Sequence, residues 1–243
     1  MSTFEIEALL LSLQVALITL VISTPIAVAL ATLMARTRWR GKILLDTLIL
    51  LPMGLPPAVI GLGLLLVLSG EGSLGSWLHD ATGFHLDFYP VGAILAASLM
   101  TVPLMARVLR PAFEATDPML LPVARTLGAS RWQGWWSITL PLVWPAVASA
   151  MALGLTAAWG ESGATLVLAA ALQPHHLGDT TAPVAMVQAL LNQQGGDDTA
   201  IHLAIISLCI ALAAIIISEL GRRRWRRRWQ ARLRPVGLPA QSQ

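Results

Sequence analysis

Five long apolar runs, separated by shorter polar segments, set the pattern of this chain. Each run is long enough to cross a hydrocarbon core of roughly 30 Å, which takes about 20 helical residues. The runs are continuous rather than alternating, which favours helices over the strands of a transmembrane barrel. We therefore predict an all-α, polytopic membrane helical bundle with five full crossings. The predicted crossings are residues 8–34, 43–69, 89–106, 140–159 and 199–220.

Two shorter apolar segments lie between the fourth and fifth runs, at residues 164–172 and 183–191. Neither is long enough to cross a bilayer alone. We expect them to form a short partial element, which a membrane tolerates where protein or water shields the backbone. If both segments crossed fully, the number of crossings would rise to seven and would still be odd.

The composition agrees with a membrane protein. Apolar residues make up 56% of the chain and charged residues 12%, whereas charged residues make up about 25% of a soluble domain. The spans take up most of the chain, so we expect a single transmembrane domain over residues 1–243 with no separate soluble domain. Three prolines in the second run, Pro52, Pro56 and Pro57, predict a kink there.

The basic residues are segregated along the chain. All 16 Lys and Arg residues lie in three regions, which alternate with segments that contain none. This is the positive-inside pattern, and it predicts an N-terminus outside and basic regions in the cytoplasm. The net charge of +3 therefore reflects topology and contact with membrane lipid, and it gives no reason to expect nucleic acid as a partner. The basic regions are residues 36–42, 107–131 and the tail 222–243.

A polar stretch at residues 113–141 separates the third and fourth runs. Its pattern predicts a short amphipathic helix, a break at Gly128, and a basic, Trp-rich second helix. Two stiff segments joined at a fixed angle can transmit displacement to the bundle, so we predict that this loop docks onto a soluble partner. The alternative is an amphipathic helix that merely lies on the membrane surface.

The spacing after Gly128 is distinctive, because nine residues separate it from Ile-Thr-Leu-Pro at 138–141. The chain here resembles permease subunits of binding-protein-dependent ABC importers, whose cytoplasmic signature is E-A-A, three residues, G, nine residues, I-x-L-P. Ala124 matches that signature, whereas Pro122 and Val123 stand where the family has Glu and the first Ala.

Further segments resemble the molybdate and sulfate permeases of this family, over about residues 51–165. The last of them carries Ser162 where the family usually has Phe. These segments are LPMGLPPAVIG at 51–61, SGEGSLG at 69–75, FEATDP at 113–118, ARTLGASRW at 124–132 and WGESGAT at 159–165.

The resemblance implies a MetI-like ABC permease fold in the bacterial inner membrane, which imports molybdate, or tungstate or sulfate. Thiamine and ferric iron remain alternative substrates. The implied partners are cytoplasmic ATPase subunits, a periplasmic substrate-binding protein and a second permease copy that completes a homodimer. We expect no enzyme activity and no cofactor, because the partner ATPase hydrolyses ATP and this chain has no G-x-x-x-x-G-K-[ST] loop. The residues expected to couple to the ATPase are Ala124, Arg125, Thr126, Leu127, Gly128, Ala129, Ser130 and Arg131.

A short turn after the fourth run supplies candidates for the translocation path or its outer gate. An ionisable residue close to a span is a functional candidate by default, although it can also be solvated or cap a helix. Asp46, at the inner start of the second run, qualifies on the same ground. The candidates in the turn are Glu161, Ser162, Gly163 and Thr165.

Three other functions compete with this interpretation. An intramembrane serine protease would use Ser162 of the G-x-S-G pattern as nucleophile and His202 as base. A metal site would use His175, His176 and Asp179. A stand-alone channel would leave the ordered cytoplasmic loop unexplained.

Overall fold

The computed structural model describes residues 3–36, 41–68, 76, 80, 89–172, 180–191 and 196–232. The elements within these ranges are helical, which confirms the all-α prediction. They are α1 (Thr3–Arg36), α2 (Lys42–Gly54), α3 (Pro57–Leu68), α5 (Tyr89–Glu114), α6 (Leu120–Thr126), α7 (Arg131–Gly134), a π-helical turn (Trp135–Thr139), α8 (Leu140–Trp159), α9 (Gly163–Leu172), α10 (Ala182–Leu191) and α11 (Gly196–Arg232).

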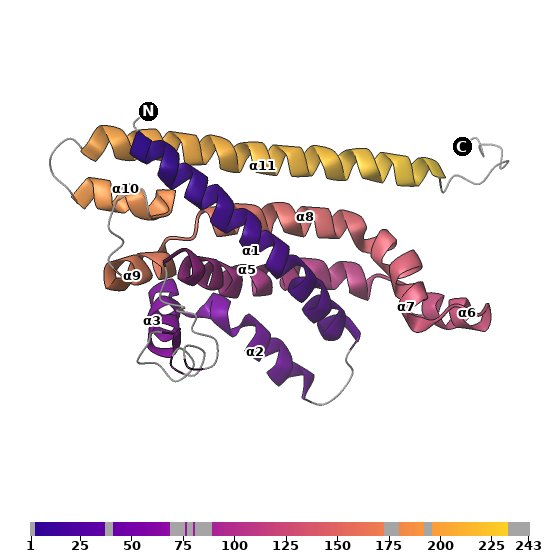
Figure 1. Ribbon diagram of the computed structural model, residues 1–243. Helices are drawn as coiled ribbons and strands as arrows, with labels where there is room; N and C mark the ends of the chain where they lie inside the picture. Colours follow the sequence, from indigo (N-terminus) through magenta and orange to yellow (C-terminus); the bar gives the residue numbers. More distant parts are fainter. Residues whose placement is uncertain are drawn as a thin grey trace.

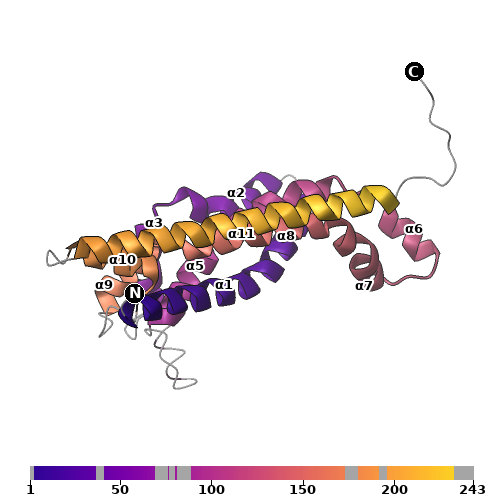
Figure 2. The ribbon, with the colours of Figure 1, turned by 90° about the horizontal axis from the view of Figure 1, so that it is seen from above.

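The bundle is elongated, and its two ends differ (Figures 1 and 2). Helices α9 and α10 lie at one end with the N-terminus, whereas α6 and α7 lie at the other. A hydrogen bond joins α10 to α1 at the first end, where the backbone amide of Ala182 donates to Ser12 Oγ over 2.6 Å. The Tyr89 hydroxyl of α5 lies 3.2 Å from Thr181 Oγ1, just before α10.

Small residues let the central helices approach closely. Ala27 and Ala31 of α1, Ala106 of α5 and Ala150 of α8 are fully buried in one core cluster. Helices in lipid gain no hydrophobic advantage from associating, so close van der Waals packing of this kind holds them together. Large apolar side chains of α11, such as Ile205 and Leu208, face outward instead.

Four segments of the described chain are long and apolar enough to cross a membrane, and a broken pair of helices adds a fifth. The pair is α2 and α3, which meet at 100°. The sequence predicted one kinked helix here, and the break is more severe, because Pro56 and Pro57 both lack the amide hydrogen that would continue the helix. Five full crossings and an outside N-terminus remain predictions.

Helices α9 and α10 have 10 residues each, which corresponds to about 15 Å. Each is too short to cross a bilayer, in agreement with the short partial element expected for this part of the chain. Between them lies the proposed metal site of His175, His176 and Asp179, which falls outside the described residues. The described residues contain no group of His, Cys, Asp or Glu suited to hold a metal ion.

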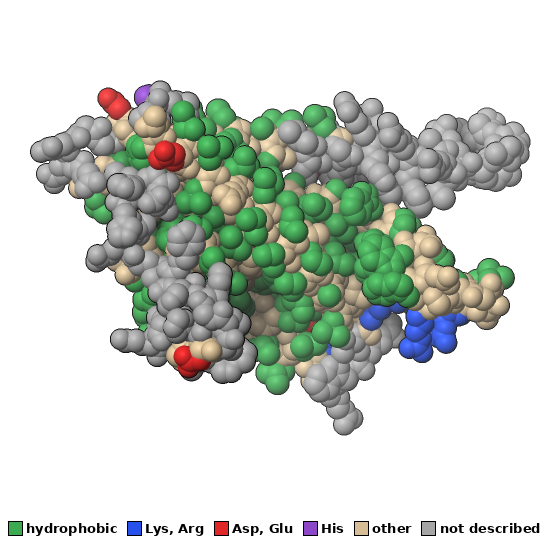
Figure 3. Space-filling view, viewed as in Figure 1, with side chains coloured by type: hydrophobic (Ala, Val, Ile, Leu, Met, Phe, Trp, Pro, Cys, Tyr) green, Lys and Arg blue, Asp and Glu red, His purple; other side chains and the backbone are tan. Residues whose placement is uncertain are grey.

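Charged side chains collect at opposite ends of the face shown in Figure 3. Lys and Arg side chains gather beside α6 and α7, and Asp, Glu and His side chains appear at the other end. The segregation noted in the sequence therefore becomes a separation along the length of the bundle.

Candidate functional site

The polar loop between α5 and α8 begins with a hydrogen-bonded turn. The Thr116 hydroxyl donates to the Ala112 carbonyl over 3.0 Å and closes the end of α5. The Met119 amide then donates to Asp117 Oδ1 over 2.8 Å, which turns the chain into α6. An aspartate in this position stabilises a turn because its side chain mimics a backbone acceptor.

Gly128 ends α6 in the left-handed region, with a φ of +90°. Its amide donates to the Arg125 carbonyl over 3.1 Å, and the Ala129 amide donates to the Ala124 carbonyl over 3.0 Å. These two bonds form a Schellman motif, in which glycine is favoured because it carries no Cβ. The break expected at Gly128 is confirmed, and its angle is fixed by hydrogen bonds.

The next helix, α7, begins at Arg131 and is preceded by a capping box at Ser130. The Gln133 amide donates to Ser130 Oγ over 3.1 Å, and the Ser130 amide donates to Gln133 Oε1 over 2.9 Å. Such reciprocal bonds satisfy two donors at a helix N-terminus. Helix α7 therefore starts at a defined residue, and the π-helical turn joins it directly to α8.

Helices α6 and α7 pack against each other at Gly134. A Cβ at Gly134 would lie 2.9 Å from Leu121 Cδ2, so a larger residue there would require the Leu121 side chain to shift. Ala124 is buried at the same contact. Ala124, which matches the family signature, therefore helps to hold the two helices together and is not part of the exposed surface.

The outer face of α6 carries an exposed apolar ridge of Met119, Val123 and Leu127. Their exposed fractions are 61%, 52% and 83%. Residues four apart lie on one face of a helix, so the three side chains form a continuous stripe. The sequence interpretation named only Leu127; the four-residue spacing of Met119 and Val123 was the signal that could have identified the other two. An exposed ridge of this kind suits docking into an apolar groove of another protein.

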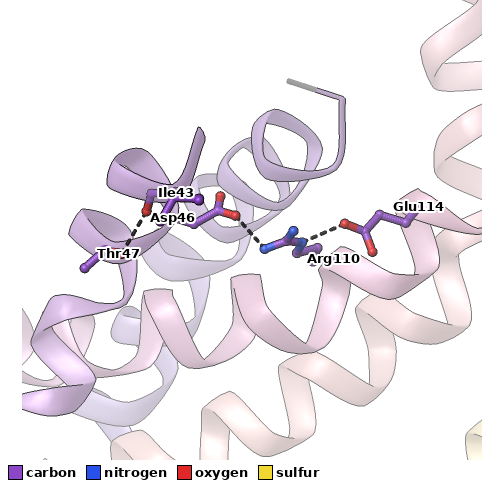
Figure 4. Close-up of polar contacts among 5 residues, drawn as sticks. All are labelled: Ile43, Asp46, Thr47, Arg110 and Glu114. Atoms are coloured by element: carbon purple, nitrogen blue, oxygen red, sulfur yellow. Dashed lines mark hydrogen bonds and ion pairs between the residues drawn. The ribbon is translucent and has the colours of Figure 1, made fainter. Parts of the chain in front are cut away.

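An ion-pair network ties the start of this loop to α2 (Figure 4). Arg110, in the last turns of α5, donates from Nη1 to Asp46 Oδ2 of α2 over 2.8 Å. It also donates from Nε to Glu114 Oε1, one turn further on, over 2.7 Å. Asp46, a candidate from its position near a span, is therefore a structural partner that joins α2 to α5.

The turn after α8 is also hydrogen-bonded. Glu161 Oε1 accepts the Ala164 amide over 2.8 Å and so caps α9. Thr165 is buried, and its hydroxyl donates to the Glu161 carbonyl over 3.0 Å. Ser162 and Gly163 are partly exposed. The four candidates therefore lie together at the start of α9, where Glu161 and Thr165 stabilise the turn.

Helix α3 packs closely on this turn. A Cβ at Gly61 would lie 2.5 Å from the Ala164 carbonyl oxygen, and one at Gly163 would lie 2.6 Å from Pro57 Cβ. The two glycines therefore bring the backbones of α3 and α9 together. Helix α3 of the broken span and the candidate turn therefore pack as one unit.

The pairing required for a serine protease is not observed. His202 Nδ1 lies 3.5 Å from Glu5 Oε1 of α1, and among the described residues no hydrogen bond joins His202 to Ser162. A serine nucleophile needs a base within hydrogen-bond reach.

Comparison with known proteins identifies the class. The family described as "Binding-protein-dependent transport system inner membrane component" matches residues 23–227. The chain belongs to this family. The permease is thus an inner-membrane component of an ABC importer, it is not an enzyme, and it works with the partners of such an importer.

Relatives of the permease include molybdenum and sulfate transport proteins. The permease is 38% identical over 215 residues to the molybdenum transport system permease protein ModB of Escherichia coli K12, covering 88% of this chain and 92% of the relative. It is 31% identical over 207 residues to a probable sulfate transport system permease protein, cysT, of Chlorokybus atmophyticus, covering 85% of this chain and 71% of the relative.

Solved structures confirm the fold of the permease. A bacterial ABC transporter involved in import of the acidic polysaccharide alginate matches with a TM-score of 0.72 and 19% identity, covering 92% of this chain and 80% of that chain. The alginate transporter in complex with an alginate pentasaccharide-bound periplasmic protein matches with a TM-score of 0.66, the same identity and the same coverage.

Proposed function

We propose that this permease forms the translocation path of a molybdate importer. The observation that supports the substrate is the 38% identity to ModB of Escherichia coli over 88% of the chain. Sulfate is the second candidate, because a sulfate permease relative matches at 31% identity over a similar length. Both substrates are tetrahedral dianions, so one kind of path suits either.

The path itself offers little fixed positive charge. Arg107 and Arg110 are the basic residues of α5, and both lie in its last two turns. An anion crossing here would meet small residues and backbone dipoles, which bind weakly and release readily. Selectivity therefore belongs mainly to the periplasmic binding protein, and a homodimer of this chain would enclose the path.

Coupling to ATP hydrolysis is assigned to the outer face of α6. The apolar ridge of Met119, Val123 and Leu127 would dock into a groove of the ATPase subunit, and the Gly128 turn with its capping box would carry the displacement to α8. The Arg110 network would carry it to α2. Closure of the ATPase subunits then draws the two docking helices together and tilts the bundle as rigid bodies.

The substrate is tested with the binding protein that co-purifies with this permease. Calorimetry should detect tight binding of molybdate, and ATP-driven uptake into proteoliposomes should follow labelled molybdate. A binding protein that holds sulfate and rejects molybdate would transfer the assignment to sulfate. One that holds only thiamine or ferric iron would rule out the oxyanion assignment.

Docking is tested by Leu127→Asp. A carboxylate on the ridge would have to be desolvated in an apolar groove, so we expect the co-purified ATPase to fall at least tenfold. Leu191→Asp is the matched control, because Leu191 is 74% exposed but lies at the end of α10, at the opposite end of the bundle. If Leu127→Asp retains the ATPase as well as Leu191→Asp does, the ridge is not the docking surface.

A further inference from the structure

A pocket of about 440 Å³ is lined by residues of α1, α6, α7 and the π-helical turn. It is open to the surface, and its walls are mainly apolar. Its charged lining residues are arginines drawn from three helices. The lining residues are Thr32, Arg36, Leu121, Pro122, Arg125, Arg131, Trp132 and Trp135.

The three guanidinium groups have no acidic partner in the described part of the chain. Arg36, Arg125 and Arg131 take part in no ion pair or side-chain hydrogen bond there, whereas Arg110 binds two carboxylates. No acidic residue lines the pocket. Clustered arginines repel one another unless an anion joins them, and a planar guanidinium is well suited to bind phosphate.

The apolar part of the lining identifies the kind of anion. Trp132 and Trp135 stack with ring centroids 5.8 Å apart, and Leu121 and Pro122 line the same pocket. Tryptophan is enriched at the headgroup level of membranes. Three cations beside an apolar, open wall match a molecule with a phosphate at one end and hydrocarbon at the other.

The pocket and the apolar ridge lie on different faces of α6. Leu121, Pro122 and Arg125 face the pocket, whereas Val123 and Leu127 belong to the exposed ridge. At 100° per residue, the two sets point in nearly opposite directions. A molecule in the pocket would therefore leave the ridge free.

We propose that this pocket binds the phosphate of an anionic phospholipid from the cytoplasmic leaflet. The headgroup would join Arg36 of α1 to Arg125 and Arg131 of the loop, and so hold α6 and α7 against the bundle. The proposal depends on the location of the permease in the inner membrane and does not depend on docking of the ATPase.

The test compares lipid retention by variants of the full-length permease. Native mass spectrometry would count bound phosphatidylglycerol on protein purified in detergent and titrated with that lipid. Arg36→Gln with Arg131→Gln should weaken binding by about 25-fold, since each guanidinium near anionic lipid contributes about fivefold. Lys42→Gln with Arg107→Gln is the matched control, because it removes two charges from the same end without touching the pocket.

Two further measurements make the result decisive. Circular dichroism and gel filtration of both double variants should match those of the wild type, so that loss of lipid is not loss of folding. Titration with inorganic phosphate distinguishes a free-anion site from a lipid site, and millimolar phosphate should displace little lipid. Equal loss of lipid in both double variants, full displacement by phosphate, or a lipid-free pocket in the assembled transporter would each overturn the proposal.

Discussion

At Gly128 the backbone has a φ of +90°, and no atom lies within 4 Å of the position a Cβ would take. The cost of a side chain there is therefore conformational, about 1–2 kcal/mol for the left-handed region. We expect Gly128→Ala to loosen the turn and lower the amount of ATPase that co-purifies. Gly63→Ala is the control, because Gly63 also has open space but lies within α3. Equal retention of ATPase by the two variants would contradict this role.

At Gly61 there is no room for a side chain, because the backbone of Ala164 lies too close. A Cβ would lie 2.5 Å from the Ala164 carbonyl oxygen and 2.9 Å from its Cα, and backbone atoms cannot move aside as a side chain can. We expect Gly61→Ala to destabilise the permease by about 1–3 kcal/mol, as overpacking usually does. Thermal unfolding in detergent measures this, with Gly63→Ala as reference. An unchanged midpoint for Gly61→Ala would show that α3 does not pack on α9 in this way.

At the scale of elements, the Arg110 network links α2 to α5 just before the loop. The side chains of the pair are partly exposed, at 28% for Arg110 and 18% for Asp46. Solvent therefore screens the ion pair, and it contributes less to stability than a fully buried pair would. Asp46 Oδ1 is nevertheless buried and without a hydrogen-bond partner. We expect Arg110→Gln to cost about 1–2 kcal/mol of stability, because it leaves the Asp46 carboxylate without its cation.

A double-mutant cycle separates the pair from the individual side chains. Adding Asp46→Asn to Arg110→Gln should restore part of the stability, because the unpaired carboxylate is then gone. Thermal unfolding of the wild type, the two single variants and the double variant measures the coupling free energy between Arg110 and Asp46. If the stability changes of the two single substitutions add up to that of the double variant, Arg110 and Asp46 do not act together.

The elements differ in how far the sequence predicted them. The helices of the loop were anticipated, because Gly128 and the Trp-rich segment are local signals. The right-angled break between α2 and α3 was underestimated, since two adjacent prolines require an interruption but do not set its angle. In the structure the pair is bent by 100°, and Gly61 and Gly163, which lack side chains, allow α3 to pack closely on α9 in that arrangement.

For the whole molecule, charge segregation predicts that the end with α6 and α7 faces the cytoplasm. Single cysteines test this in a Cys209→Ser background. Ser130→Cys should react with a membrane-impermeant thiol reagent only in inside-out vesicles, and Asp198→Cys only in right-side-out vesicles. Both positions are exposed. Labelling of both from one side would contradict an odd number of crossings between the loop and α11.

The sequence by itself determined the membrane class, the helical composition, the basic end and the position of the loop. These depend on local composition and on periodicity, which every segment carries independently of its neighbours. It also pointed to the family through the spacing of Gly128 from residues 138–141, and the family match over residues 23–227 confirms this.

Only the tertiary structure decided which side chains of these segments face each other. It turned Ala124 inward against α7, left Met119 and Val123 beside Leu127 on the outer face, and assigned Glu161 to cap α9. It also placed Arg36 and Arg125, from helices far apart in the chain, in the lining of one pocket. Such contacts join segments that share no local signal, because they depend on how whole helices pack, and small residues such as Gly61 and Gly134 set that packing.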